Sequence, residues 1–167
     1  MKTVIFSHGK ESGPYGSKIK YLMEIVEKFN MNAVSLDYRD LMVPEDRALR
    51  LIDESQKYND VILVGSSMGG YASLIASETI NPIGLFLLAP AVYIPSYKYQ
   101  EFNPKFKVGH IVFGYNDEVI PVENGIKLAL NTKMPLTLIP SDHRLNADIK
   151  YIGEIFKIFL KEINDTY

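Results

Sequence analysis

Residues 60–70, DVILVGSSMGG, carry the most informative pattern in this chain. The first five form an apolar run of strand length, and the run that follows, 71–77, has helical character. Between them Gly65, Ser67 and Gly69 fit G-x-S-x-G, which in a strand–turn–helix context is typical of a nucleophile elbow. The serine of such a turn has a strained backbone and projects its hydroxyl from the sheet edge. An ordinary Ser/Gly-rich loop would have the same letters, so the hypothesis depends on the rest of the chain.

The composition is that of a soluble globular protein. The chain has 167 residues, of which 47% are hydrophobic and 23% charged, and a net charge of −2 without blocks of like charge, which disfavours nucleic acid and acidic membranes. It has no cysteine, which excludes disulfides, a thiol nucleophile and a cysteine metal site. The N-terminal apolar run is too short for a signal peptide, and the longest one, 83–94, is too short to span a bilayer. We therefore expect one cytoplasmic domain over residues 1–167, with no nucleic-acid or membrane partner.

Apolar runs alternate with amphipathic stretches along the chain. Six runs predict strands, at 3–7, 33–36, 61–64, 83–88, 110–113 and 136–139. Helices are predicted over 19–29 and 71–77 and from Pro44, Pro121 and about Ala147, and the Tyr- and Pro-rich segment 92–106 is predicted to be a loop. Continuously apolar strands that alternate with helices indicate a parallel sheet covered on both faces. The expected fold is α/β, a three-layer α/β/α sandwich with a six-stranded, essentially parallel sheet.

Three groups with complementary chemistry follow three of these strands. Ligands of such sheets bind beyond the carboxyl ends of the strands. Ser67 follows the third strand, Asp117 the fifth and His143 the sixth, in the chain order serine, acid, histidine. A histidine can take the serine proton near neutral pH, and a carboxylate behind the ring fixes the tautomer and stabilises the imidazolium. Ser67, Asp117 and His143 are therefore the candidate catalytic residues.

Each of these groups has a simpler explanation when it is taken alone. Asp117 could be a turn residue, with Glu118 as the alternative acid. His143 could be a surface histidine beside Asp142, whose side chain is expected to diverge from the imidazole. His110, at the start of a strand, is interpreted as structural. The joint placement at one sheet edge is what favours catalysis.

An acyl-transfer site also needs backbone N–H donors for the developing oxyanion. The residue after the nucleophile, Met68, is expected to provide one, and Lys10, in the loop after the first strand, the other. The ring of His8 is expected to hydrogen-bond within that loop. The candidate substrate-pocket residues are His8, Tyr93 and Tyr97.

The chain resembles a known family through short segments: HGKESG at 8–13, GSSMGG at 65–70, DEVIP at 117–121 and DH at 142–143. It is similar to the α/β-hydrolase superfamily, and within it to the small single-domain esterases of the YqiA-like group. The resemblance implies a sheet without the two leading antiparallel strands of larger members. It also implies Ser67 as nucleophile, Asp117 as acid, His143 as base and esterase activity on short acyl chains. Larger lipases insert a helical cap where this chain has only 92–106, so no cap domain is expected.

The function expected from the sequence is hydrolysis of small carboxylic esters by a Ser-His-Asp acyl-enzyme mechanism. The partner would be a small-molecule ester, and no cofactor or metal is implied, because the nucleophile, base and oxyanion donors are protein groups. A thioesterase or amidase could use the same triad, and a non-catalytic interaction module could retain the fold. Residues 9–13 do not match a phosphate-binding G-x-x-x-x-G-K-[ST] loop. The sequence predicts no oligomeric state.

Overall fold

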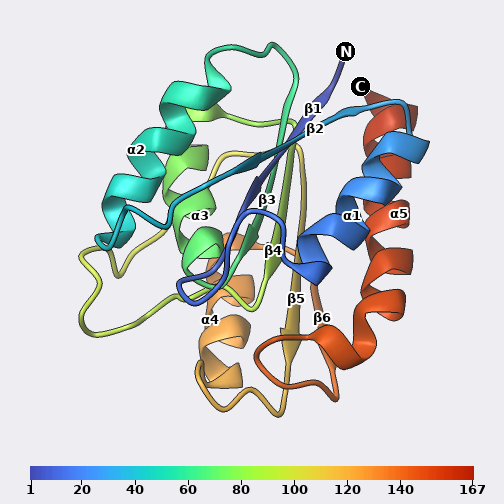
Figure 1. Cartoon of the computed structure of the whole chain (residues 1–167). Helices are drawn as coiled ribbons and strands as arrows, with labels where there is room; N and C mark the ends of the chain where they lie inside the picture. Colours follow the sequence, from blue (N-terminus) through green and yellow to red (C-terminus); the bar gives the residue numbers. More distant parts are fainter.

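The computed structural model describes residues 1–167 and contains one six-stranded sheet between two layers of helices (Figure 1). The strands are β1 (Thr3–Ser7), β2 (Asn32–Leu36), β3 (Val61–Ser66), β4 (Gly84–Leu88), β5 (Val108–Gly114) and β6 (Leu136–Ile139). They lie in the order β2-β1-β3-β4-β5-β6, and every neighbouring pair is parallel. The predicted parallel sheet of six strands is confirmed.

Helices cover both faces of the sheet. They are α1 (Ser17–Lys28), α2 (Pro44–Ser55), α3 (Met68–Ile80), α4 (Val122–Thr132) and α5 (Ile149–Thr166), with a short 3-10 turn η1 (Asn146–Asp148) before the last. In Figure 1, α1 and α5 lie on one side of the strands and α2, α3 and α4 on the other. The three-layer architecture is therefore confirmed. None of these helices is long and apolar enough to cross a membrane.

The core is split by the sheet into two apolar clusters, which explains why the strands are apolar along their whole length. Successive side chains of a strand point to opposite faces. Val4 and Phe6 of β1 pack in the cluster that includes α1 and α5, whereas Ile5 packs in the cluster that includes α2, α3 and α4. Both faces of β1 are buried, so the strand needs no polar alternation.

The observed element bounds differ from the predicted ones mainly at the ends. β3 and β5 extend beyond the predicted apolar runs, and α3 begins at Met68 instead of residue 71. Gly69 and Gly70 disfavour helix by intrinsic propensity, so their place in the first turn of α3 reflects tertiary packing. Segment 92–106 contains neither helix nor strand, as predicted.

Candidate active site

Ser67 occupies the turn between β3 and α3. Its backbone has φ 54° and ψ −116°, a conformation that L-residues rarely adopt and that stores strain. The turn is held from both sides, because the Ser67 N–H donates to the Leu88 carbonyl at 3.0 Å and its carbonyl accepts from the Ala91 N–H at 2.9 Å. The end of β4 and the residues that follow it thus maintain the strained conformation at the carboxyl edge of the sheet.

The glycines around Ser67 are required by close backbone approaches. A Cβ atom on Gly65 would collide with the backbone of Gly69 and Gly70, and one on Gly69 would collide with the carbonyl of Ser7 in β1. Any other residue at these positions would push α3 away from β1 or β3. The G-x-S-x-G spacing therefore reflects the packing of α3 against the sheet.

Asp117, His143 and Ser67 form a continuous chain of hydrogen bonds. The distance from Ser67 Oγ to His143 Nε2 is 2.9 Å, and from His143 Nδ1 to Asp117 Oδ2 it is 2.7 Å. An ionised carboxylate only accepts, so Nδ1 carries the proton and Nε2 is free to accept from the serine hydroxyl. The Asp117 side chain is fully buried, and its Oδ1 accepts from the N–H groups of Val119 at 2.8 Å and Ile120 at 2.7 Å. The carboxylate is thereby fixed behind the imidazole ring.

The two neighbouring acids do not contact the imidazole ring. Asp142 Oδ1 accepts from the N–H groups of Arg144 and Leu145, both at 3.1 Å, so its side chain diverges from the ring as expected. Glu118 Oε2 accepts from the backbone N–H of His143 at 3.3 Å. Glu118 therefore supports the loop, and Asp117 alone pairs with the ring.

Ser67 and His143 open into a cleft of about 710 Å³. The loop after β1, the start of α1, segment 92–106 and the loop around residues 118–120 form its walls. On one wall Lys18 donates to the Arg144 carbonyl at 3.0 Å, and desolvation by burial lowers the pKa of its ammonium to about 8, an effect that Asp142 partly opposes. The cleft thus offers space for a small molecule next to Ser67.

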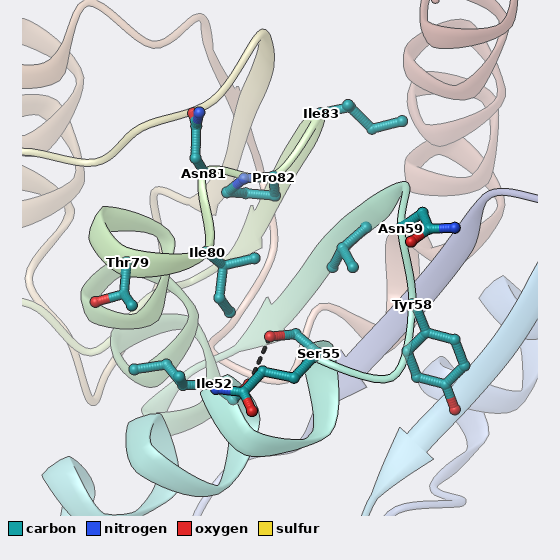
Figure 2. Close-up of a pocket in the computed structure, with 11 residues that line it drawn as sticks. Ile52, Ser55, Tyr58, Asn59, Thr79, Ile80, Asn81, Pro82 and Ile83 are labelled. Atoms are coloured by element: carbon teal, nitrogen blue, oxygen red, sulfur yellow. Dashed lines mark hydrogen bonds between the residues drawn. The ribbon is translucent and has the colours of Figure 1, made fainter.

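A second cavity, of about 280 Å³, lies at the opposite end of the sheet (Figure 2). It is bordered by the end of α2, the end of α3 and the turn that leads into β4, as Figure 2 shows for Ser55, Ile80 and Pro82. The Ser55 hydroxyl donates to the Ile52 carbonyl at 2.7 Å, and the only ionisable side chain is Tyr58. This cavity has no activated nucleophile, so the candidate chemistry belongs to the larger cleft.

The two expected oxyanion donors lie beside Ser67 in sequence or in space. Met68 is the first residue of α3, so its N–H has no acceptor within the helix. Lys10 lines the cleft, and its N–H donates to no other backbone or side-chain group. The Cα of Gly9, the residue before it, is near enough that a Cβ there would stand 3.4 Å from Ser67 Cβ. Neither amide therefore has an acceptor within the protein.

The ring of His8 is committed to the protein. It is fully buried, its Nδ1 lies 2.7 Å from the Gly9 carbonyl oxygen, and its Nε2 accepts from the Tyr38 N–H at 2.9 Å. The carbonyl only accepts and the amide only donates, so the ring is neutral with its proton on Nδ1. Burial is the main cause that lowers its pKa. The ring is bonded within its loop, as expected. Because both ring nitrogens are occupied, neither is left to contact a substrate in the pocket.

Of the two tyrosines expected in the pocket, only Tyr97 lines the cleft. Tyr93 does not, which corrects the expectation. Its backbone has φ 56°, its hydroxyl accepts from Asn131 Nδ2 at 3.1 Å, and the Lys127 ammonium lies 4.1 Å from its ring centroid. The left-handed backbone turns this side chain toward α4, which the composition of segment 92–106 could not predict.

Arg47 was not among the residues predicted to contribute to the site. Its side chain is buried on α2 and donates from Nη1 to the His8 carbonyl at 2.8 Å. A signal was present in the sequence: position 47 lies on the same helical face as the buried Ala48, Leu51 and Ser55. A charged residue on a buried face indicates a specific internal partner.

Comparison with solved structures identifies the fold of this chain. No protein-family model and no curated protein match the chain. A proposed hydrolase of the alpha/beta superfamily from Xanthomonas campestris pv. campestris superimposes with a TM-score of 0.86, over 96% of this chain and 97% of that chain, at 27% identity. The chain has a minimal α/β-hydrolase fold.

Two further solved structures share the α/β-hydrolase fold. Est1E from Butyrivibrio proteoclasticus has a TM-score of 0.81 and 18% identity, over 99% of this chain and 88% of that chain. An α/β serine hydrolase without a lid, from Xanthomonas campestris, has a TM-score of 0.76 and 14% identity, over 96% and 81%. The expected absence of a cap agrees with segment 92–106, which forms no helix that could cover the cleft.

Proposed function

We propose that the protein is a serine hydrolase that cleaves small carboxylic esters through an acyl-enzyme. The observation that carries this proposal is the chain of hydrogen bonds from Asp117 through His143 to Ser67, two of whose members, Ser67 and His143, line a cleft. A serine hydroxyl alone is a weak nucleophile, and a neutral imidazole 2.9 Å away is the base that activates it. The solved structures with this fold include proteins described as hydrolases and esterases, which supports hydrolysis in general.

The geometry supports a two-step reaction. His143 Nε2 takes the proton of Ser67 as Oγ attacks the ester carbonyl carbon, while Asp117 stabilises the imidazolium. The carbonyl oxygen becomes an oxyanion and accepts from the N–H groups of Met68 and Lys10. The carbon–alkoxide bond then breaks, and His143 gives the proton to the departing alcohol. In the second step His143 deprotonates a water molecule that attacks the acyl carbonyl carbon. The bond between Ser67 Oγ and the acyl carbon then breaks, and His143 returns the proton to Oγ as the acid is released.

The cleft favours short acyl chains, because the segment that borders it is fixed and brings no covering helix. The Tyr71 hydroxyl donates to Glu45 at 2.7 Å and accepts from the Tyr99 N–H at 3.1 Å, which ties segment 92–106 to α2 and α3. Glu45 also accepts from the Lys98 N–H at 2.8 Å. A segment held in this way forms one wall of the cleft and leaves its mouth open.

A comparison of two neighbouring serines tests the proposed function. The purified protein is assayed with nitrophenyl acetate, a matched acetyl thioester and a matched acetanilide. Ser67→Ala is expected to lower kcat by up to about 10⁶-fold, because the attacking atom is removed. Ser66→Ala is the matched control, and it is expected to retain activity because Ser66 lies outside the chain of hydrogen bonds.

The relative rates also separate the alternatives. A preference for the thioester or the anilide would leave the proposed triad mechanism in place and would change the proposed substrate class to thioesters or amides. Absence of turnover on all three substrates, or turnover by Ser67→Ala equal to that of the wild type, would contradict the proposal and favour a non-catalytic module.

A further inference from the structure

We infer that Arg47 is a positioning residue for the oxyanion-binding loop, which it holds from beneath the cleft while it supplies an unneutralised positive charge. This inference rests on the proposed function, since it assigns a role to a residue outside the cleft in the same reaction. A positioning role predicts that loss of Arg47 lowers kcat without lowering the melting temperature, whereas a purely structural role predicts that the two fall together.

Arg47 is buried without a carboxylate partner. Arg47 is only 2% exposed. Its guanidinium donates hydrogen bonds to the His8 carbonyl at 2.8 Å and to the Leu41 carbonyl at 3.5 Å. No carboxylate lies within 4.0 Å of the guanidinium, whereas Arg50 on the same helix pairs with Asp40 at 2.6 Å on the surface. Burying a charge that is not paired costs free energy of folding. Stability therefore does not explain this arginine.

The partners of Arg47 lead directly to the proposed oxyanion donor. The guanidinium carbon lies 5.2 Å from the ring centroid of Tyr38, and the Tyr38 N–H donates to His8 Nε2 at 2.9 Å. The His8 ring in turn donates from Nδ1 to the Gly9 carbonyl at 2.7 Å. Two successive carbonyl groups of the loop, those of His8 and Gly9, are thus bonded to buried side chains.

Fixing the Gly9 carbonyl also fixes the direction of the Lys10 N–H. The peptide unit is planar and trans, so its C=O and N–H point in opposite directions. Because the Gly9 carbonyl points to the buried His8 ring, the Lys10 N–H points away from that ring, and both Gly9 and Lys10 line the cleft. Loss of the Arg47 contact would let the His8 and Gly9 peptides rotate.

The charge of Arg47 acts in the same direction as the amides. The ester carbonyl is uncharged in the ground state and becomes an oxyanion in the transition state. A cation inside the protein, where the dielectric constant is below that of water, stabilises the oxyanion more than the neutral ester. Arg47 should therefore contribute mainly to kcat and little to KM.

Three variants of Arg47 separate this role from packing. Arg47→Met retains chain length but removes the charge and the donors, Arg47→Gln retains a donor without charge, and Arg47→Lys retains the charge. On nitrophenyl acetate, kcat of Arg47→Met is expected to fall about 10- to 100-fold, below the loss for a direct oxyanion donor, with KM changed less than about 2-fold. Arg47→Lys is expected to recover part of kcat. Lys57→Met, just beyond α2, is the control, because it removes a surface cation whose only ion-pair partner is Glu54, at 2.6 Å; its kcat is expected to stay within about 2-fold of wild type.

The melting temperature identifies a merely structural effect. Removing the unpaired buried charge favours folding, whereas leaving the His8 carbonyl without its donor opposes it, so Tm of Arg47→Met is expected to stay close to that of the wild type. A folded Arg47→Met with wild-type kcat, or a loss of kcat that only follows a lowered Tm, overturns the inference. If Arg47→Met does not fold, Arg47→Gln decides by the same two readouts.

A crystal structure of Arg47→Met, or of Arg47→Gln if Arg47→Met does not fold, gives a readout that is independent of turnover. A rotated Gly9–Lys10 peptide supports the inference, and an unmoved peptide together with unchanged kcat contradicts it. If the wild type hydrolyses no ester, the proposed function fails separately, and an unmoved peptide in the variant overturns the positioning role as well.

Discussion

Asp117 is the single residue whose placement determines how His143 can act. Its buried carboxylate bonds the ring through Oδ2 and two backbone N–H groups through Oδ1, so it can neither rotate nor exchange partners without losing bonds. Asp142, next to His143 in sequence, is bonded to the N–H groups of Arg144 and Leu145 instead. Sequence proximity and spatial partnership therefore differ at this site.

The two aspartates give a matched pair of substitutions. Asp117→Asn is expected to lower kcat by up to about 10⁴-fold, because an amide in this position favours the wrong tautomer of His143. Asp142→Asn retains an oxygen that accepts from the same N–H groups, so its kcat is expected to stay within a few-fold of wild type, by analogy with surface substitutions. Steady-state kinetics on an acetyl ester measure both, and equal, mild losses would argue against a fixed acid.

Individual site residues were predictable where chain order and strand ends constrained them. Ser67, Asp117 and His143 each follow a strand, and parallel strands bring their carboxyl ends to one edge. Tyr93 was not predictable, because its direction depends on a left-handed backbone in an irregular segment. Arg47 was missed because its partner is a backbone carbonyl, which leaves no complementary charge in the sequence.

Among the elements, segment 92–106 is the one that the proposed function makes responsible for which acyl chains fit. Backbone contacts to Glu45, Tyr71 and Glu78 hold it against α2 and α3. It brings Ile94 and Tyr97 to the cleft as the apolar part of one wall. On the proposed function, an anchored segment without a helix is expected not to enclose a long acyl chain.

Selectivity for acyl length follows from this wall. Each methylene that the cleft buries contributes about 0.8 kcal/mol, so kcat/KM should rise over the first few carbons and then stop. We expect the highest kcat/KM on acetyl to butyryl nitrophenyl esters and a clear fall by octanoyl. The series is assayed below the micelle concentration of each ester. Activity that still rises at ten or twelve carbons would require a covered tunnel and would contradict this description of the segment.

Element types were predictable from apolar periodicity, and element ends were less so. The bounds of β1 and β6 agree with the apolar runs, because these runs end at turn or polar residues. The start of α3 did not follow propensity: Gly69 and Gly70 are helical because α3 must approach β1 and β3 more closely than a Cβ allows. Packing constraints of this kind depend on the neighbours of an element and are not visible in its own sequence.

For the molecule as a whole, the layered core leaves one histidine, His8, buried and another, His110, half-buried. His8 is enclosed beneath the loop after β1, and His110 lies in β5 with Nε2 at 2.8 Å from Thr137 Oγ1 and its ring stacked on Phe86. Burial lowers the pKa of both below the ordinary value of 6.5. Neither ring exchanges a proton in the proposed reaction, and the prediction drawn from their titration concerns the stability of the fold.

The stability of the fold should depend on pH through these rings. Below pH 6.5 the unfolded state binds protons that the native rings do not, so the free energy of unfolding falls as pH decreases. The stability that the two neutral rings contribute is fully present above pH 6.5. It is lost as the pH falls from 6.5 through the lowered pKa values of the native rings. Urea unfolding from pH 7.5 to 5.0, above the range where carboxylates titrate, should show this decline. His110→Gln should show a shallower decline, and a free energy of unfolding constant over this range would contradict the prediction.

The central claim is that Ser67 is the nucleophile activated by His143, and covalent labelling tests it most directly. A fluorophosphonate probe reacts with an activated serine, and the tryptic peptide that would carry it spans residues 58–98 and also contains Ser66. We predict one label per chain, placed on Ser67 by fragmentation of that peptide, absent in Ser67→Ala and strongly slowed in His143→Ala. Labelling at another residue, or equal labelling of the wild type and Ser67→Ala, would contradict the account.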